Sequence, residues 1–315
     1  LDAGSDAVVQ VGNSDNSGYE NDDVTVVIGD ITATAGTWYT SDADAAVYVM
    51  NNSDSDITIG NINLAAYGDY SSQAVVRIDD NTGSRAEVHT GSIVAVAKGD
   101  AAEAEFHMDD NSDADITIGG DVTLTSSDDT YLHVLDNSDN TNLTIEGSVV
   151  MSGGSDSYVN IDSNSDTELT IEGDLTLYAG DVTLNNHMDS GNASMDVTDN
   201  SDSSFTITGN VSLNGVDTGL FISNNDYSSF IAGDVSLSAT DFSGPDSRSP
   251  WLRARSRSSS SRTWAAAAFA IAARGAEVRA PVARTVACGA PPSCSITLRS
   301  RVGASRGPPA RAEPS

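Results

Sequence analysis

Basic residues, proline and cysteine are almost absent from the first three quarters of this 315-residue chain. Before residue 247 the only basic side chains are Arg77, Arg85 and Lys98, against 44 of the 46 acidic ones. No proline precedes Pro245, and both cysteines lie beyond residue 287. Because phosphate binding needs clustered Lys and Arg, this composition excludes nucleic acid as a partner.

Aromatic residues and long apolar runs are scarce as well. Aromatic side chains make up only 6% of the chain, which argues against a wide globular core and favours a thin core repeated many times. No run of about 18 apolar residues occurs, so we predict no transmembrane helix. The chain begins at Leu1 rather than Met and has no signal-peptide pattern, so we expect a fragment or a processed chain.

The composition changes abruptly near residue 244. Residues 244–315 hold 12 of the 15 basic residues and all eight prolines, and are rich in Arg, Ser, Ala and Pro. Such a segment buries little apolar surface and is typical of disorder, with helix propensity only over residues 264–273. We divide the chain into a repeat domain, 1–243, and this tail. The tail is a basic linker, a C-terminal cap, or a segment read out of frame.

A three-part unit recurs through residues 1–243. It starts with an alternating strand such as Val47-Tyr48-Val49, followed by a polar turn built on asparagine. A second strand such as Ile57-Thr58-Ile59 runs into a glycine, and a third strand follows directly. The turn asparagines are Asn13, Asn52, Asn81, Asn111, Asn137, Asn164, Asn200 and Asn225, and the glycines include Gly120, Gly147, Gly173 and Gly209.

Each piece alternates apolar and polar residues with period two, so each is predicted to be a strand with one buried face. Three strands and three turns per unit of about 29 residues predict an all-β fold, a right-handed parallel β-helix of about eight coils. An antiparallel sandwich is the competing fold, but it does not require the same asparagine-then-glycine order in every unit. The longest gaps predict side loops at roughly 16–42 and 179–193.

The recurring turn residues are expected to have mechanical roles. Each glycine is predicted to supply a positive φ at a sharp corner. Each asparagine is predicted to adopt left-handed geometry and to donate its amide to the asparagine of the next coil. These residues form the predicted structural ladder.

The repeats over about residues 7–240 resemble the parallel β-helix passengers of bacterial autotransporters and related surface adhesins. This resemblance implies a secreted or cell-surface, mostly non-enzymatic protein that presents faces and loops to a glycan or protein partner. It also implies a monomer or part of a longer solenoid.

The aspartate-rich turns are candidate calcium sites. Stacked coils bring their carboxylates within about 5–10 Å, where like charges repel and a hard cation relieves the repulsion. A solvated acidic face explains the same residues without a metal. The candidates are Asp109, Asp110, Asp113, Asp136, Asp139, Asp162, Asp166, Asp199 and Asp202.

Arg77, His107 and His133 are expected to lie in one outward column of the first strands, with Asp79 and Asp109 two residues further along. The arrangement resembles the exposed strand face of pectate-lyase-like β-helices, which implies an alternative function as a carbohydrate-active enzyme, a polysaccharide lyase or hydrolase. A varied solvent-exposed column is the competing interpretation.

Outward threonines form a further column, at Thr58, Thr117, Thr144, Thr170 and Thr206. Flat threonine arrays on solenoids resemble ice-binding faces, so ice binding is a third functional hypothesis. Threonine also has an intrinsic preference for exposed strand positions. Most coils, moreover, lack the second threonine of a pair.

Overall fold

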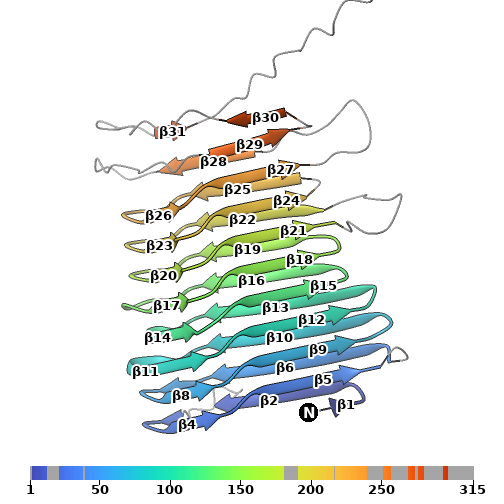
Figure 1. Ribbon diagram of the computed structural model, residues 1–315. Coiled ribbons are helices and arrows are strands. Elements are labelled where there is room, and N and C mark those ends of the chain that lie inside the picture. Colours follow the sequence, from blue (N-terminus) through green and yellow to red (C-terminus); the bar gives the residue numbers. More distant parts are fainter. Residues whose placement is uncertain are drawn as a thin grey trace, which may run out of the picture.

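The computed structural model describes residues 2–12, 21–37, 40–180, 191–215 and 217–239, together with four short strands beyond residue 250. All of its regular elements within these residues are strands. The strands of residues 2–239 stack as three parallel sheets in a column of coils (Figure 1), whereas Ala276–Arg279 and Cys294–Ile296 pair antiparallel with their neighbours. The predicted parallel solenoid with three strands per coil is therefore confirmed.

The first sheet contains the strand that opens each coil. Its pairs are parallel and in register from β2 to β25. The strands are β2 (Asp6–Gly12), β6 (Asp42–Met50), β10 (Ser71–Asp79), β13 (Ala101–Asp109), β16 (Asp129–Leu135), β19 (Ser157–Asp162), β22 (Asn192–Thr198) and β25 (Asp217–Ser223).

The second sheet follows the asparagine turn. It consists of β4 (Thr25–Ile28), β8 (Asp56–Ile59), β11 (Thr82–Thr90), β14 (Ser112–Ile118), β17 (Asn142–Ile145), β20 (Glu168–Ile171), β23 (Ser204–Ile207) and β26 (Ser229–Ala232), with the two-residue strands β3 (Asn21–Asp22) and β7 (Asn52–Ser53) beside it. A register irregularity separates Thr82 from Ala86 in β11.

The third sheet follows the glycine corner. It consists of β5 (Ile31–Gly36), β9 (Ile62–Tyr67), β12 (Ile93–Lys98), β15 (Val122–Ser126), β18 (Val149–Gly153), β21 (Leu175–Ala179), β24 (Val211–Gly215) and β27 (Val235–Ala239), with β1 (Asp2–Ala3) next to β5. Eight triplets of strands thus stack, and about seven full turns separate the first triplet from the last.

The core is a thin column inside the three sheets. Burial alternates along the strands, as in Val122–Ser126, because successive side chains of a strand point to opposite faces. Equivalent apolar residues lie above one another, for example Ile116, Leu143 and Leu169, all with exposures of 2% or less. Among the largest fully buried side chains, the only aromatic ones are Phe106 and Phe205. This agrees with the thin core expected from the composition.

The predicted asparagine ladder is present and runs unbroken from Asn21 to Asn225. Each side-chain amide donates to the Oδ1 of the next ladder asparagine, with N···O distances from 2.7 to 3.0 Å. From Asn81 onward each amide also donates to a strand carbonyl of the preceding coil. Asn21 occupies the place in the first coil for which Asn13 was predicted, and Asn13 lies outside the described residues.

Left-handed backbone geometry belongs to the neighbours of the ladder asparagines, which corrects the sequence prediction. Residues with positive φ lie one position before and two positions after the ladder asparagine, as Asp110 and Asp113 do around Asn111, each with a φ of 54°. Short polar side chains that bond locally to backbone tolerate this region best. The Asp-Asn-Ser-Asp motif is therefore a corner with two left-handed residues around a buried amide.

The corner glycines were also assigned the wrong role. Gly120, Gly147, Gly173 and Gly209 do not have a positive φ. A Cβ placed on Gly147 would lie 2.5 Å from the Gly120 carbonyl carbon and 2.6 Å from the Asp121 nitrogen. Glycine is required there because two coils approach each other closely, rather than because the backbone turns to positive φ.

Two boundary predictions also change. Residues 16–42, expected to be a side loop, contain the second and third strands of the first coil, β4 and β5. In the tail the structure describes β28 (Trp251–Ser256), β29 (Phe269–Ala273), β30 (Ala276–Arg279) and β31 (Cys294–Ile296). The sequence has helix propensity over residues 264–273, but β29, within this range, is a strand because it pairs with β27. The division at residue 244 stays a prediction.

Candidate functional site

The outer face of the first sheet brings together the ionisable residues singled out in the sequence. Arg77 pairs with His107 in register between β10 and β13, and His107 pairs with His133 of β16. The two imidazole rings are stacked, with centroids 4.7 Å apart and planes within 5° of parallel. The predicted column is therefore formed. We call Arg77, Asp79, Glu105, His107, Asp109 and His133 the histidine cluster.

His107 lies between two carboxylates of its own strand. Its Nδ1 is 3.0 Å from Asp109 Oδ2, and its Nε2 is 2.7 Å from Glu105 Oε2. Residues 105, 107 and 109 share one face because the strand alternates with period two. Arg77 lies 3.9 Å from the same Glu105 carboxylate. Glu105 was missed in the sequence analysis, although its position two residues before His107 is the signal that reveals it.

Burial and charge together set the ionisation of the cluster. Burial lowers the pKa of His107, but hydrogen bonds to Asp109 and Glu105 outweigh it and raise that pKa to about 9. His107 is therefore an imidazolium at neutral pH. Burial and the neighbouring His107 charge lower the pKa of His133. Burial and the adjacent Asp109 carboxylate raise the pKa of Asp79 to about 7.

The geometry limits what the cluster does chemically. Both ring nitrogens of His107 are occupied by carboxylates, and only 8% of the residue is exposed. Arg77 Nε and His133 Nδ1 are buried atoms without a hydrogen-bond partner. Asp79, whose pKa lies near the physiological range, is the member best suited to exchange a proton. Its accessible area is small, since it is also only 8% exposed.

Substitution of Asp79 by asparagine is expected to stabilise the protein by roughly 4 kcal/mol at pH 8. Because its folded-state pKa of about 7 exceeds its ordinary value of 3.8, the folded protein binds more protons than the unfolded chain between these values. Stability therefore falls as pH rises through this window, and the variant avoids that loss. Urea unfolding at pH 3.5 and pH 8 measures it, and an equal effect at both pH values would contradict the assignment.

The candidate calcium residues shape the corners through their backbone, and some also accept hydrogen bonds through their carboxylates. Asp110, Asp113, Asp136, Asp139, Asp166, Asp199 and Asp202 are left-handed corner residues. Asp109 holds His107 and accepts the Leu135 backbone N–H, and Asp162 accepts the Thr198 hydroxyl at 2.7 Å. Within the described ranges, no group of three or more His, Cys, Asp or Glu side chains is arranged to hold a metal ion. Calcium binding stays a prediction.

A second hydrogen-bonded ladder, missed in the sequence analysis, follows the corner glycines. At every step except that from Ser92 to Asp121, the residue after the glycine accepts a backbone N–H from the next coil, as Asp121 Oδ1 does from Ser148 at 2.8 Å. Equivalent bonds join Asp30 to Asn61, Asn61 to Ser92, Ser148 to Asp174, Asp174 to Asn210 and Asn210 to Asp234. The sequence signal is an Asp, Asn or Ser directly after every corner glycine.

The predicted threonine column lies on the second sheet. Thr117, Thr144, Thr170 and Thr206 are consecutive register partners, and His89 separates Thr58 from Thr117. The array is a single column, interrupted once. Ice binding stays a prediction.

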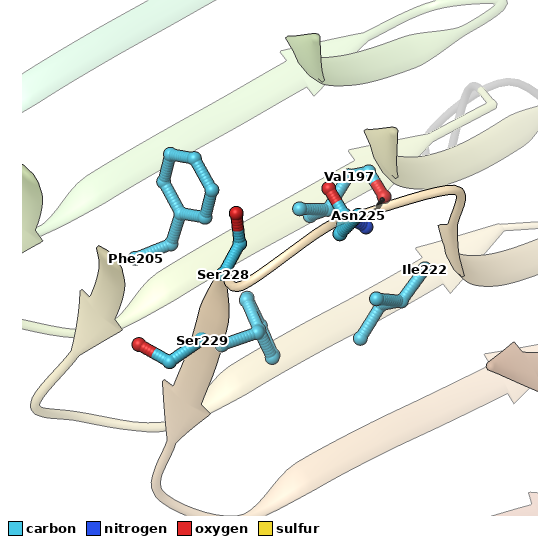
Figure 2. A pocket seen from close by; sticks show the side chains of 7 residues that line it. Val197, Phe205, Ile222, Asn225, Ser228 and Ser229 are labelled. Atoms are coloured by element: carbon cyan, nitrogen blue, oxygen red, sulfur yellow. Dashed lines mark hydrogen bonds between the residues drawn. The ribbon is translucent and has the colours of Figure 1, made fainter. Parts of the chain in front are cut away.

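A small apolar recess lies inside the last two coils. It is too narrow to admit a water molecule, and Phe205 and Ile222 lie on opposite sides of Ser228 (Figure 2). Its lining comprises Val197, Phe205, Ile222, Asn225, Ser228, Ser229 and Phe230. None of these side chains is ionisable, so the recess offers no acid–base chemistry and is separate from the histidine cluster.

Comparison of the chain with protein-family models, with curated proteins and with solved structures finds no match. Among the described residues, no helix is long and apolar enough to cross a membrane.

Proposed function

We propose that this chain is a structural, adhesin-like solenoid of the cell surface or the extracellular space, which acts by presenting its outer faces to a glycan or protein partner. The observation that carries the proposal is the continuous ladder of asparagines from Asn21 to Asn225, all but the first of them buried. It links the coils from the first to the last, so that outward residues are held at a fixed repeat of about 4.8 Å. Such a scaffold suits repeated, multivalent contact.

The acidic coat supports the same function. With 44 acidic and three basic residues before position 247, the acidic faces of the solenoid favour solubility and repel the acidic faces of other copies. His107 further supports a structural role, because its ring nitrogens serve the ion pairs of the sheet rather than a substrate.

The location is tested with antibodies raised against the purified full chain. We expect them to label intact producing cells, or to detect the protein in the culture medium, and to lose the cell signal after protease treatment of intact cells. Labelling that occurs only after lysis would contradict a surface or extracellular protein.

The second candidate function is that of a carbohydrate-active enzyme. Asp79, with a pKa of about 7 beside Arg77, His107 and the unpartnered His133 Nδ1, is the specific observation that favours it. The assay follows release of reducing or unsaturated sugar ends from polygalacturonate and alginate, with and without Ca²⁺. We expect no turnover. Turnover that is abolished in Arg77→Ala, with unchanged thermal unfolding, would establish the enzyme instead.

A further inference from the structure

The middle of the outer face of the third sheet carries no charge from β5 to β27, although Asp2 of β1 pairs in register with Thr34. Its two outward columns over eight strands hold only uncharged side chains. They are Thr32, Thr34, Asn63, Ala65, Val94, Val96, Thr123, Thr125, Val150, Ser152, Thr176, Tyr178, Ser212, Asn214, Ser236 and Ser238. We call these sixteen residues the neutral face. Lys98 lies just beyond it, at the end of β12.

Strand propensity does not explain the lack of charge. Acids occupy about one position in six before residue 247, and outward strand positions of the other two sheets carry them. The first sheet carries Asp44, Glu103, Glu105 and Asp129, and the second carries Asp56, Glu87, Asp115 and Glu168. All three sheets have the same parallel backbone. The sheet structure therefore does not explain why one face lacks acids.

The neutral face is also a regular surface. The strands from β5 to β27 pair in register without a bulge, and the outward residues are small or β-branched apart from Asn63, Tyr178 and Asn214. The corner residues from Asp30 to Asp234, which form two hydrogen-bonded runs, border it. An uncharged centre with a polar rim is the usual anatomy of a protein interface.

We propose that the neutral face is a docking surface for the neutral face of a second copy of this chain. Strands about 4.8 Å apart, with five residues of about 3.3 Å each, give a footprint of roughly 600 Å² per copy. The pair would bury roughly 1,200 Å², which is the lower end of the range for specific interfaces. Flat sheets pack face to face, and a two-fold contact sets the same residues against each other.

Charge favours this occupant and this face. Two copies that meet through the first or second sheet would set acidic columns against each other, which costs several kcal/mol. The neutral face itself sets no carboxylates against each other, and the nearest ones are the corner residues Asp30, Asp121, Asp174 and Asp234 at its rim. The remaining repulsion between two acidic solenoids is long-range, so salt screens it. Association should therefore strengthen as ionic strength rises, in contrast to an attraction between acidic faces and the Arg-rich tail.

Sedimentation equilibrium of the full chain over a range of NaCl concentrations tests the proposal. We expect a monomer–dimer equilibrium whose dissociation constant falls with added salt. Thr125→Asp, in the neutral face, should raise that constant at least about tenfold, whereas Thr144→Asp, a matched threonine in the second sheet, should change it less than about twofold. Circular dichroism and thermal unfolding establish that both variants keep the fold, and Ser152→Asp replaces Thr125→Asp if that variant unfolds.

Three results would overturn the proposal. One is a protein that stays monomeric at all salt and protein concentrations. This holds also if the monomer binds a neutral polysaccharide or slows ice recrystallisation through this face. Another is association that weakens with salt, which would assign the contact to the basic tail. The third is an equal loss of association in Thr125→Asp and Thr144→Asp, which would place the contact elsewhere.

Discussion

Replacement of Asn137 by alanine is expected to lower the free energy of unfolding by about 4 kcal/mol. The Asn137 amide donates to Asn164 Oδ1 at 2.9 Å and to the Met108 carbonyl at 2.7 Å, and its Oδ1 accepts two bonds from Asn111. All of these groups are buried, and Asn137 itself is 0% exposed. Alanine therefore removes four bonds and leaves donors and acceptors of two neighbouring coils without partners.

Asn142→Ala is the matched control for this prediction. Asn142 lies in the same coil and its amide bonds to Asp115 at 2.7 Å, but its side chain is exposed to water. Its loss should therefore change stability by less than about 0.5 kcal/mol. Urea unfolding followed by circular dichroism measures both variants. Equal, small effects would mean that the ladder adds little to the fold.

Replacement of Gly147 by alanine is expected to cost about 3 kcal/mol. The new Cβ would meet three atoms closer than 3.0 Å, two of which belong to the backbone of the preceding coil. That backbone cannot withdraw without breaking the bond from the Ile93 N–H to the Asp121 carbonyl or the bond from the Ser148 N–H to Asp121 Oδ1. The two coils must therefore separate locally, and the corner ladder is interrupted.

Gly29 provides the matched control, since it occupies the same corner in the first coil and has no atom within 4 Å of a built Cβ. Gly29→Ala should be neutral or slightly stabilising, because alanine lowers the conformational entropy of the unfolded chain. Thermal unfolding compares the two variants. If Gly147→Ala is as stable as Gly29→Ala, the close approach of coils is not what requires glycine.

The fold was predictable because its signals are local and repeated. The period-two alternation, the turn asparagines and the corner glycines recur at similar spacing, so each unit reports the same architecture. Asn111 and Gly147 were therefore placed correctly in the coil. Their mechanisms were harder to predict, since the left-handed geometry of Asp110 and the contact of Gly147 with Gly120 depend on the backbone of an adjacent coil.

The histidine cluster was predictable only in part. Strand alternation placed Arg77, His107 and His133 in one column, and the structure confirms that column. Predicting the partners of His107 requires the side-chain rotamers, because a carboxylate two residues away on a strand reaches the ring only in some rotamers. The neutral face needed the assignment of all three sheets, since no single repeat shows that one outer side lacks acids.

The central claim is that each coil stacks in parallel register on the next, and disulfide formation tests it most directly. In a Cys288→Ser, Cys294→Ser background, Thr144→Cys and Thr170→Cys lie at paired positions of β17 and β20. Paired strands are about 4.8 Å apart, a separation that a disulfide spans. Mild oxidation should form an intramolecular disulfide for this pair and none for Thr144→Cys with Thr206→Cys, two coils apart. A pair 144–170 that stays reduced in the folded protein would contradict the stacked solenoid.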